Sequence, residues 1–275
     1  MVEILIGIGI LGGLGLVFGL ILSAASKVFY VETDPRLDQL NECLPGANCG
    51  GCGYSGCAAY AQAVIEGKAK IGLCASGGNE SAQAMAKIMG VKAEAVERKV
   101  AMVMCRSFDV KTKGEYDGIQ DCVAASKVAG KGPLACEYGC LGFGTCLKAC
   151  KYGALSLKNG RAYIDADKCV GCMSCVEVCP RHVIAPVPYD ADIVVACNSH
   201  AKGGAVSKAC NIGCLGCGLC ERACPNDAIK VTNNLARIDY SKCVSCGLCA
   251  EVCPRNLIAD ANLRQDQDLL PAKAR

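Results

Sequence analysis

The sequence has no tryptophan, 4 phenylalanines in 275 residues and only two histidines, His182 and His200. With so few large aromatic side chains, the folded part needs a source of stability besides apolar burial. The 29 basic and 26 acidic residues form no block of one sign, which argues against nucleic-acid binding. No G-x-G-x-x-G follows a predicted strand with an acidic residue downstream, so nothing indicates a nicotinamide or flavin site.

Cysteine, in contrast, occurs 25 times. Disulfide frameworks are typical of short secreted chains, whereas this chain is long and its cysteine count is odd. Zinc sites, iron–sulfur clusters and free thiols remain, and the spacing of the cysteines distinguishes them. The 32 glycines let the backbone bend closely around a bound group.

An uncharged run of 23 residues extends from Ile4 to Ser26. A bilayer span needs about 20 residues. A cleaved signal peptide is the alternative, but no basic residue precedes the run and no convincing A-x-A site follows it. We therefore expect a transmembrane anchor over residues 1–28. Lys27 and Arg36 follow the run, which predicts a single-pass protein of the cell membrane with its remainder on the cytoplasmic side.

Eight cysteines of the second half recur at a constant offset of 74 residues, which indicates a duplicated domain. The second copy contains CLGCGLCERACP and CVSCGLCAEVCP, two C-x2-C-x2-C-x3-C-P runs. Such runs are typical of two-cluster ferredoxins, in which the fourth cysteine of each run binds the other cluster. The second copy is thus predicted to hold two 4Fe-4S clusters, one on Cys214, Cys217, Cys220 and Cys253, the other on Cys243, Cys246, Cys249 and Cys224.

The first copy departs from this pattern at two positions, with Phe143 in place of Cys217 and Lys151 in place of Pro225. We expect Cys136 to supply the missing thiolate. The predicted ligand sets are Cys136, Cys140, Cys146 and Cys179 for one cluster, and Cys169, Cys172, Cys175 and Cys150 for the other. Asn159-Gly160 and Asn233-Asn234 each predict a hairpin between the two runs of a copy.

Zinc is disfavoured by these runs, because structural zinc sites use two C-x2-C pairs separated by roughly 12–20 residues. Disulfides would have to join near neighbours in unfavourable geometry. A Rieske centre needs two histidine ligands, and neither histidine lies in a suitable motif.

A separate group of cysteines lies in LPGANCGGCGYSGC and at Cys74. The spacing C-x2-C-x4-C-x16-C predicts a further 4Fe-4S cluster on Cys49, Cys52, Cys57 and Cys74. Cys43 lies outside the pattern and is expected to be a free thiol. Four cysteines remain unassigned: Cys105, Cys122, Cys197 and Cys210. They either hold a sixth cluster beside the predicted five, or are buried reduced thiols that pack as small hydrophobes.

The expected fold class is therefore a set of small α+β iron–sulfur domains. The predicted order is a transmembrane helix, one 4Fe-4S domain and two tandem ferredoxin-like units. The boundaries are 1–28 for the anchor, 29–95 for the 4Fe-4S domain, 96–130 for a connection, 131–190 for the first ferredoxin-like unit, 191–204 for a second connection, 205–263 for the second unit and 264–275 for a tail.

This order, and above all LPGANCGGCGYSGC with the distal Cys74, resembles the B subunit of the Rnf complex, a membrane-bound ferredoxin:NAD oxidoreductase. The resemblance covers nearly the whole chain, although an additional ferredoxin unit prevents transfer of a cluster count. It implies an electron-transfer subunit that accepts electrons from reduced ferredoxin and passes them to membrane and peripheral subunits of an ion-translocating complex. It implies no catalytic residue beyond the clusters. The alternatives are an electron-transfer subunit of another membrane redox complex, and an iron–sulfur scaffold or sensor.

Overall fold

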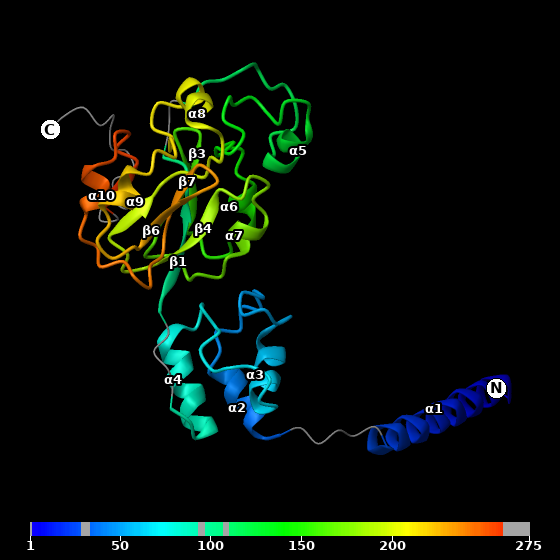
Figure 1. Ribbon diagram of the computed structural model, residues 1–275. Coiled ribbons are helices and arrows are strands. Elements are labelled where there is room, and N and C mark those ends of the chain that lie inside the picture. The colour runs from blue at the N-terminus through cyan, green and yellow to red at the C-terminus, as the bar shows by residue number, and fades with distance from the viewer. Residues whose placement is uncertain (1, 29–33, 93–96, 107–109, 261–275) are drawn as a thin grey trace.

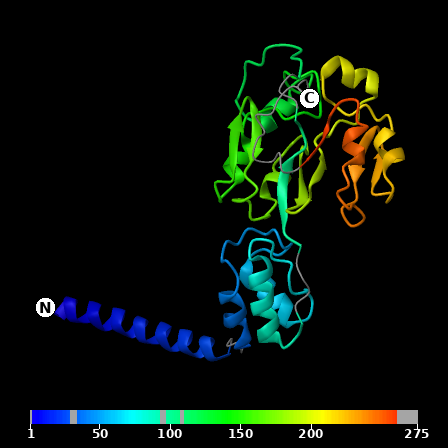
Figure 2. The ribbon, with the colours of Figure 1, turned by 90° about the vertical axis from the view of Figure 1, so that its left-hand side faces the viewer.

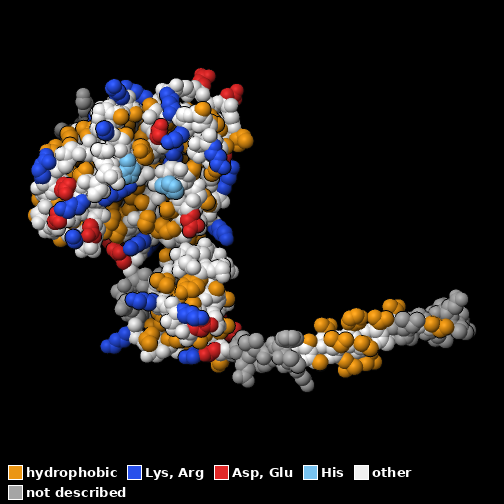
Figure 3. Space-filling model, turned by 45° about the vertical axis from the view of Figure 1, so that its right-hand side comes forward, with side chains coloured by type: hydrophobic (Ala, Val, Ile, Leu, Met, Phe, Trp, Pro, Cys, Tyr) orange, Lys and Arg blue, Asp and Glu red, His pale blue; other side chains and the backbone are white. Residues whose placement is uncertain are grey.

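The computed structural model describes residues 2–28, 34–92, 97–106 and 110–260. The uncharged N-terminal run forms helix α1 (Val2–Val28). Figure 3 shows hydrophobic side chains along it, and Leu11 is 74% exposed. The side chains of α1 are described for Ile6 and residues 11–26 only. Over the described residues, no helix is both long and apolar enough to cross a membrane.

Three helices form the next domain: α2 (Arg36–Glu42), α3 (Cys57–Ile65) and α4 (Gly78–Met89). Their core contains Leu40, Tyr60 and Met85, each no more than 1% exposed. The Tyr60 hydroxyl donates to the Lys70 carbonyl at 2.9 Å and accepts from the Leu73 N–H at 3.2 Å. This apolar core orders the helices and fixes the loop that leads toward Cys74.

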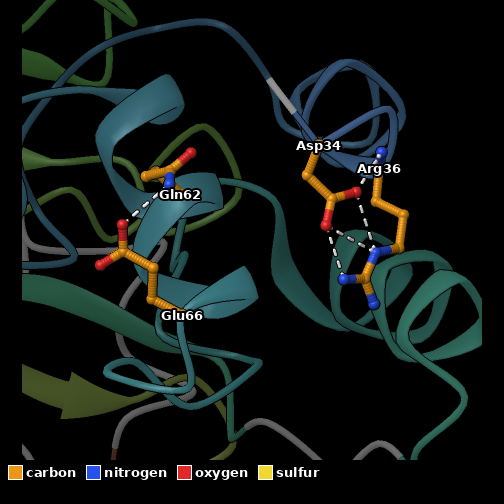
Figure 4. A network of polar contacts seen from close by, with 4 residues as sticks. All are labelled: Asp34, Arg36, Gln62 and Glu66. Atoms are coloured by element: carbon orange, nitrogen blue, oxygen red, sulfur yellow. Dashed lines mark hydrogen bonds and ion pairs between the residues drawn. The ribbon is translucent and has the colours of Figure 1, made fainter. Parts of the chain in front are cut away.

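Polar contacts on the surface of this domain are local (Figure 4). Arg36 Nη2 lies 2.6 Å from Asp34 Oδ2, and the Gln62 amide donates to Glu66 Oε1 at 2.8 Å within α3. The hydrogen bonds from Arg36 lower the pKa of Asp34 to about 2. Exposed pairs of this kind contribute little to stability, so the buried side chains dominate.

The remainder of the chain forms two similar units that lie side by side (Figures 1 and 2). In each, two short helices flank a hairpin. The first unit has α6 (Thr145–Ala149), β2 (Leu155–Lys158), β3 (Arg161–Ile164) and α7 (Ser174–Glu177). The second has α9 (Leu219–Ala223), β6 (Ile229–Thr232), β7 (Leu235–Ile238) and α10 (Leu248–Glu251).

Both predicted hairpins are confirmed. Lys158 pairs with Arg161 across Asn159 and Gly160, and Thr232 pairs with Leu235 across Asn233 and Asn234. All four turn residues have positive φ, between 48° and 68°. Such angles match the twist of the strands in a two-residue turn and favour asparagine and glycine.

Each unit gains a second two-stranded sheet from a strand that precedes it in the sequence. Strand β1 (Lys99–Val103) pairs with β4 (Ile184–Pro188), and β5 (Ile193–Val195) pairs with β8 (Ile258–Asp260), both antiparallel. Two further helices, α5 (Cys122–Lys127) and α8 (Gly203–Ala209), lie in the connections that lead into the first and second unit. Cysteines form a large share of both cores.

Candidate iron–sulfur sites

The N-terminal group of cysteines converges where α3 begins. The Cys57 N–H donates to the Asn48 side-chain oxygen at 2.8 Å, which fixes the loop before the helix. Burial raises the pKa of the Cys74 thiol, and the nearby thiols of Cys52, Cys57 and Cys49 raise it further. The thiols of the other three cysteines in the C-x2-C-x4-C-x16-C spacing therefore lie near that of Cys74.

In the second unit, two cavities are each lined by four cysteines. One contains Cys214, Cys217, Cys220 and Cys253, and the other Cys224, Cys243, Cys246 and Cys249. Three members of each set come from one run and the fourth comes from the other run. This is the crossed arrangement expected for two neighbouring 4Fe-4S clusters.

One group of the first unit follows the same rule. Burial raises the pKa of the Cys175 thiol to about 12, and the nearby thiols of Cys169, Cys172, Cys146 and Cys150 add to the rise. The Ala101 N–H of β1 donates to Cys169 Sγ at 3.4 Å. The strand added before the unit therefore takes part in this group, which the cysteine spacing did not predict.

The other group of the first unit has an unexpected fourth member. Burial raises the pKa of Cys146 to about 12, and the thiols of Cys140, Cys122 and Cys179 add to the rise. The Cys140 thiol likewise has Cys122 and Cys179 as thiol neighbours. The structure thus brings Cys122, instead of the expected Cys136, to the side chains of this group.

Cys122 is held there by the cap of α5. Asp121 Oδ1 accepts from the N–H groups of Val123 and Ala124 at 2.8 and 3.1 Å. Thr145 Oγ1 accepts from the Cys122 N–H at 2.9 Å and donates to Asp121 Oδ2 at 2.7 Å. Since Thr145 directly precedes Cys146, these bonds fix Cys122 beside the cysteine run.

The remaining cysteines separate into a set of four and one residue on its own. Cys105, Cys136, Cys197 and Cys210 line one cavity of about 270 Å³. One of the two interpretations of the sequence groups Cys105, Cys197 and Cys210, but with Cys122 as their fourth member. Cys43 is partly exposed, and its carbonyl accepts from the Ser81 hydroxyl at 2.6 Å.

The chemistry of these sets fits iron–sulfur clusters. A 4Fe-4S cluster takes four thiolates, and each set offers four cysteines, with no carboxylate or imidazole needed. Among the residues that the structure describes, no three Cys, His, Asp or Glu side chains are arranged to hold a single metal ion.

The N-terminal group lies against the first unit. A Cβ atom on Gly51 would be 2.7 Å from the Cys172 carbonyl oxygen, so only glycine allows this approach. The buried Tyr152 hydroxyl lies near cysteines of both groups. Burial raises its pKa, and the thiols of Cys49 and Cys172 contribute to the rise.

Three family models match parts of the chain. "Putative Fe-S cluster" matches residues 44–76, "4Fe-4S binding domain" residues 162–185, and "4Fe-4S dicluster domain" residues 213–257. Cys105, Cys122, Cys136, Cys197 and Cys210 lie outside all three ranges.

Full-length relatives cover more of the sequence. The B subunit of the Na(+)-translocating ferredoxin:NAD(+) oxidoreductase complex of Acetobacterium woodii is 43% identical over 87% of this chain and 73% of its own. The B subunit of the proton-translocating complex of Clostridium ljungdahlii is 46% identical over 83% and 81%. The B subunit of the ion-translocating oxidoreductase complex of Methanosarcina acetivorans is 39% identical over 86% and 90%.

Proposed function

Because the chain belongs to the B subunits of the Rnf complex and is an electron-transfer subunit of that ferredoxin:NAD oxidoreductase, we propose that it accepts electrons from reduced ferredoxin and conducts them toward the membrane subunits. The observation that carries this proposal is the succession of four-cysteine sets from the second unit to the N-terminal domain. The uncharged run from Ile4 to Ser26 offers no ionisable path for ions. Ion translocation is therefore assigned to partner subunits.

We assign five 4Fe-4S clusters to the sets that support the relay. They are Cys49, Cys52, Cys57 and Cys74; Cys150, Cys169, Cys172 and Cys175; Cys122, Cys140, Cys146 and Cys179; Cys214, Cys217, Cys220 and Cys253; and Cys224, Cys243, Cys246 and Cys249. Bound clusters supply reversible one-electron chemistry. The protein holds the thiolates, limits their exposure and donates hydrogen bonds to sulfur, which together adjust the reduction potential. The Ala228 N–H, for example, donates to Cys224 Sγ at 3.3 Å.

Ferredoxin is proposed to dock on the second unit, at the end farthest along the relay from the N-terminal domain. Cys217 and Cys246 are the two exposed cysteines of the protein. The neighbouring Val244 and Leu248 are 64% and 41% exposed, which leaves an apolar surface beside a cluster set. An external donor needs close approach to a cluster, and an exposed apolar surface of this kind favours protein contact.

The N-terminal run is proposed to anchor the protein in the cell membrane with its cysteine domains on the cytoplasmic side. The 23 uncharged residues and the basic residues that follow them support this topology. The anchor would keep the N-terminal 4Fe-4S domain, the next domain along the chain, near the membrane partners.

The test uses the anaerobically purified full chain with reduced ferredoxin as donor. We expect cluster absorption to bleach on mixing, with no NAD(+) reduction until the partner subunits are added. Val244→Asp should slow bleaching at least tenfold and leave the iron content unchanged. Val91→Asp is the control: it changes a 55% exposed position in the N-terminal domain and should not slow bleaching. Failure to bleach would exclude ferredoxin as the donor, and NADH formation by the chain alone would contradict a pure electron-transfer role.

A further inference from the structure

The hydroxyl group of Tyr152 in the first unit has no role in the features described so far. Its oxygen is buried and has no hydrogen-bond partner among the residues that the structure describes. Burying a hydroxyl without a partner costs free energy, and most buried polar groups in proteins are hydrogen-bonded. An orphaned donor at this place therefore points to an acceptor that is neither backbone nor side chain.

The neighbours of this hydroxyl belong to two different cysteine sets. Burial raises the pKa of the phenol, the nearby Ser76 hydroxyl partly offsets the rise, and the thiols of Cys49, Cys172 and Cys74 add to it. The Ser76 and Tyr152 hydroxyls do not meet hydrogen-bond geometry. Two of these three cysteines belong to the N-terminal set, so a hydroxyl of one domain lies beside the set of the other.

We propose that Tyr152 donates a hydrogen bond to a sulfur atom of the 4Fe-4S cluster of the N-terminal domain and so sets its reduction potential from across the domain contact. The inference rests on the cluster assignment proposed above, in which Cys49, Cys52, Cys57 and Cys74 are the ligands. Hydrogen bonds to sulfur are one of the means by which a protein adjusts the potential of such a cluster. A phenol keeps its proton at neutral pH and is therefore able to donate.

The contact between the two domains brings the hydroxyl to this place. A Cβ atom on Gly51 would be 2.7 Å from the Cys172 carbonyl oxygen, so the two backbones approach closely. On the N-terminal side, Ser76 Oγ lies 3.7 Å from Cys49 Sγ. The Tyr152 hydroxyl therefore has Cys49 and Ser76 as its neighbours from the other domain.

A second tyrosine near the same set has a purely structural role. Burial raises the pKa of Tyr60, and the Cys74 thiol contributes to the rise. The Tyr60 hydroxyl, however, donates to the Lys70 carbonyl at 2.9 Å and accepts from the Leu73 N–H at 3.2 Å. Its hydrogen bonds are made inside its own domain, whereas the Tyr152 hydroxyl has none within the described part of the chain.

The second copy of the repeat has a different residue at this position. At the offset of 74 residues, Tyr152 corresponds to Asn226, which is exposed. The tyrosine thus occurs in the copy whose Cys172 contacts the N-terminal domain. This placement favours a role at the contact over a role common to both units.

The direction of the effect follows from charge. Reduction adds one negative charge to a cluster, and a hydrogen bond donated to it stabilises the more negative state. The Tyr152 hydroxyl should therefore raise the midpoint potential of the N-terminal cluster. Its removal should make electron transfer into that cluster less favourable.

Tyr152→Phe tests the proposal, because it removes the hydroxyl and keeps the ring. Reductive titration of the anaerobic full chain with dithionite, followed by EPR, gives the midpoint potential of each cluster. The signal of the N-terminal cluster is the one that Cys57→Ser removes. We expect Tyr152→Phe to make reduction of this cluster about tenfold less favourable, which is about 59 mV for a one-electron couple. Iron content and the other midpoint potentials should stay unchanged.

Tyr116→Phe is the matched control. It also removes one hydroxyl that precedes or belongs to the first unit, but this hydroxyl donates to the Ile119 carbonyl at 3.0 Å. It should shift no midpoint potential. An equal shift in Tyr116→Phe and Tyr152→Phe would contradict a specific role of Tyr152.

A spectroscopic measurement detects the hydrogen bond itself. In deuterium oxide, ENDOR of the reduced N-terminal cluster should show one exchangeable deuteron coupling fewer in Tyr152→Phe than in the parent. The inference is overturned by an unchanged midpoint potential, by a shift at the cluster of Cys172 instead, by an unchanged set of deuteron couplings, or by loss of iron from Tyr152→Phe.

Failure of this inference is distinguishable from failure of the proposed function. If Cys57→Ser removes no EPR signal, both the inference and the underlying cluster assignment are wrong. If the signal is present but Tyr152→Phe leaves it unshifted, only the inference is wrong. Dithionite replaces ferredoxin as the reductant, so neither result depends on the identity of the natural donor.

Discussion

At the scale of single residues, the replacement of one ligand by another explains the irregular first unit. Phe143 occupies the position of Cys217 in the repeat, and its ring contacts Tyr116 with centroids 5.3 Å apart. The connection that contains Tyr116 continues into α5, which presents Cys122 to the same set. In the proposed assignment, the missing thiolate therefore comes from outside the ferredoxin motif.

Moving the cysteine from position 122 to position 143 tests directly whether Cys122 replaces the missing ligand. Cys122→Ser should lower the iron content by about four per chain, because one 4Fe-4S cluster loses a thiolate. The double variant Cys122→Ser/Phe143→Cys should regain those irons, since it restores the arrangement of the second unit. Iron and sulfide assays with absorption spectra measure both effects. Full iron content in Cys122→Ser alone would show that Cys122 is not a ligand.

Sequence spacing and the proposed assignment agree for most sets, because in three of the four ferredoxin-like sets three of the four cysteines lie within one tight loop. Cys214, Cys217 and Cys220 are separated by two residues each, so their convergence is local. Cys122 and Cys136 are different, since both lie outside the C-x2-C runs. Their partners depend on the path of a long connection, which spacing does not encode. The only sign in the sequence that a cysteine from outside the run is needed is that the first copy has no counterpart of Cys217.

At the scale of elements, α5 depends on its cap. A helix of six residues is too short to be stable alone, and Asp121 satisfies two of its free N–H groups. Asp121→Ala should cost about 1 kcal/mol and let Cys122 move away from its set. We expect Asp121→Ala to release about four irons to a chelator faster than the parent protein does. Absorbance measures the rate of this release. Asp121→Asn keeps a cap and should behave nearly like the parent. Equal release rates in all three proteins would contradict this role of α5.

Short strands limit prediction at this scale. The hairpins are local and carry Asn-Gly or Asn-Asn turns, so both were predicted. Strands β1 and β5 have five and three residues and pair with partners far along the chain. The segments 96–130 and 191–204, predicted as connections, therefore contain strands that no local pattern reveals.

At the scale of the whole molecule, one close contact joins the N-terminal domain to the first unit. In this contact, a Cβ atom on Gly51 would lie 2.7 Å from the Cys172 carbonyl oxygen, and one on Gly171 would lie 3.5 Å from the Ala75 side chain. Gly51→Ala would force the two parts apart, at a cost of roughly 1–3 kcal/mol for overpacking. We expect slower reduction of the N-terminal cluster by ferredoxin with unchanged iron content, measured by rapid-freeze EPR. Gly114→Ala, where nothing lies within 4 Å, is the matched control, and equal rates in the two variants would exclude this path.

The distribution of apolar residues predicts which parts survive removal of iron. The ferredoxin-like units include Cys146, Cys175 and Cys220 in their cores, so cluster ligation replaces part of the apolar packing. The core of the N-terminal domain contains Leu40, Tyr60 and Met85, and Cys74 is its one buried cysteine. After anaerobic chelation, far-UV circular dichroism should lose the strand contribution, and limited proteolysis should digest residues 110–260 first. Helices α2 and α4 should remain protected. Uniform protection across the chain after complete iron removal would show that the units fold without their clusters.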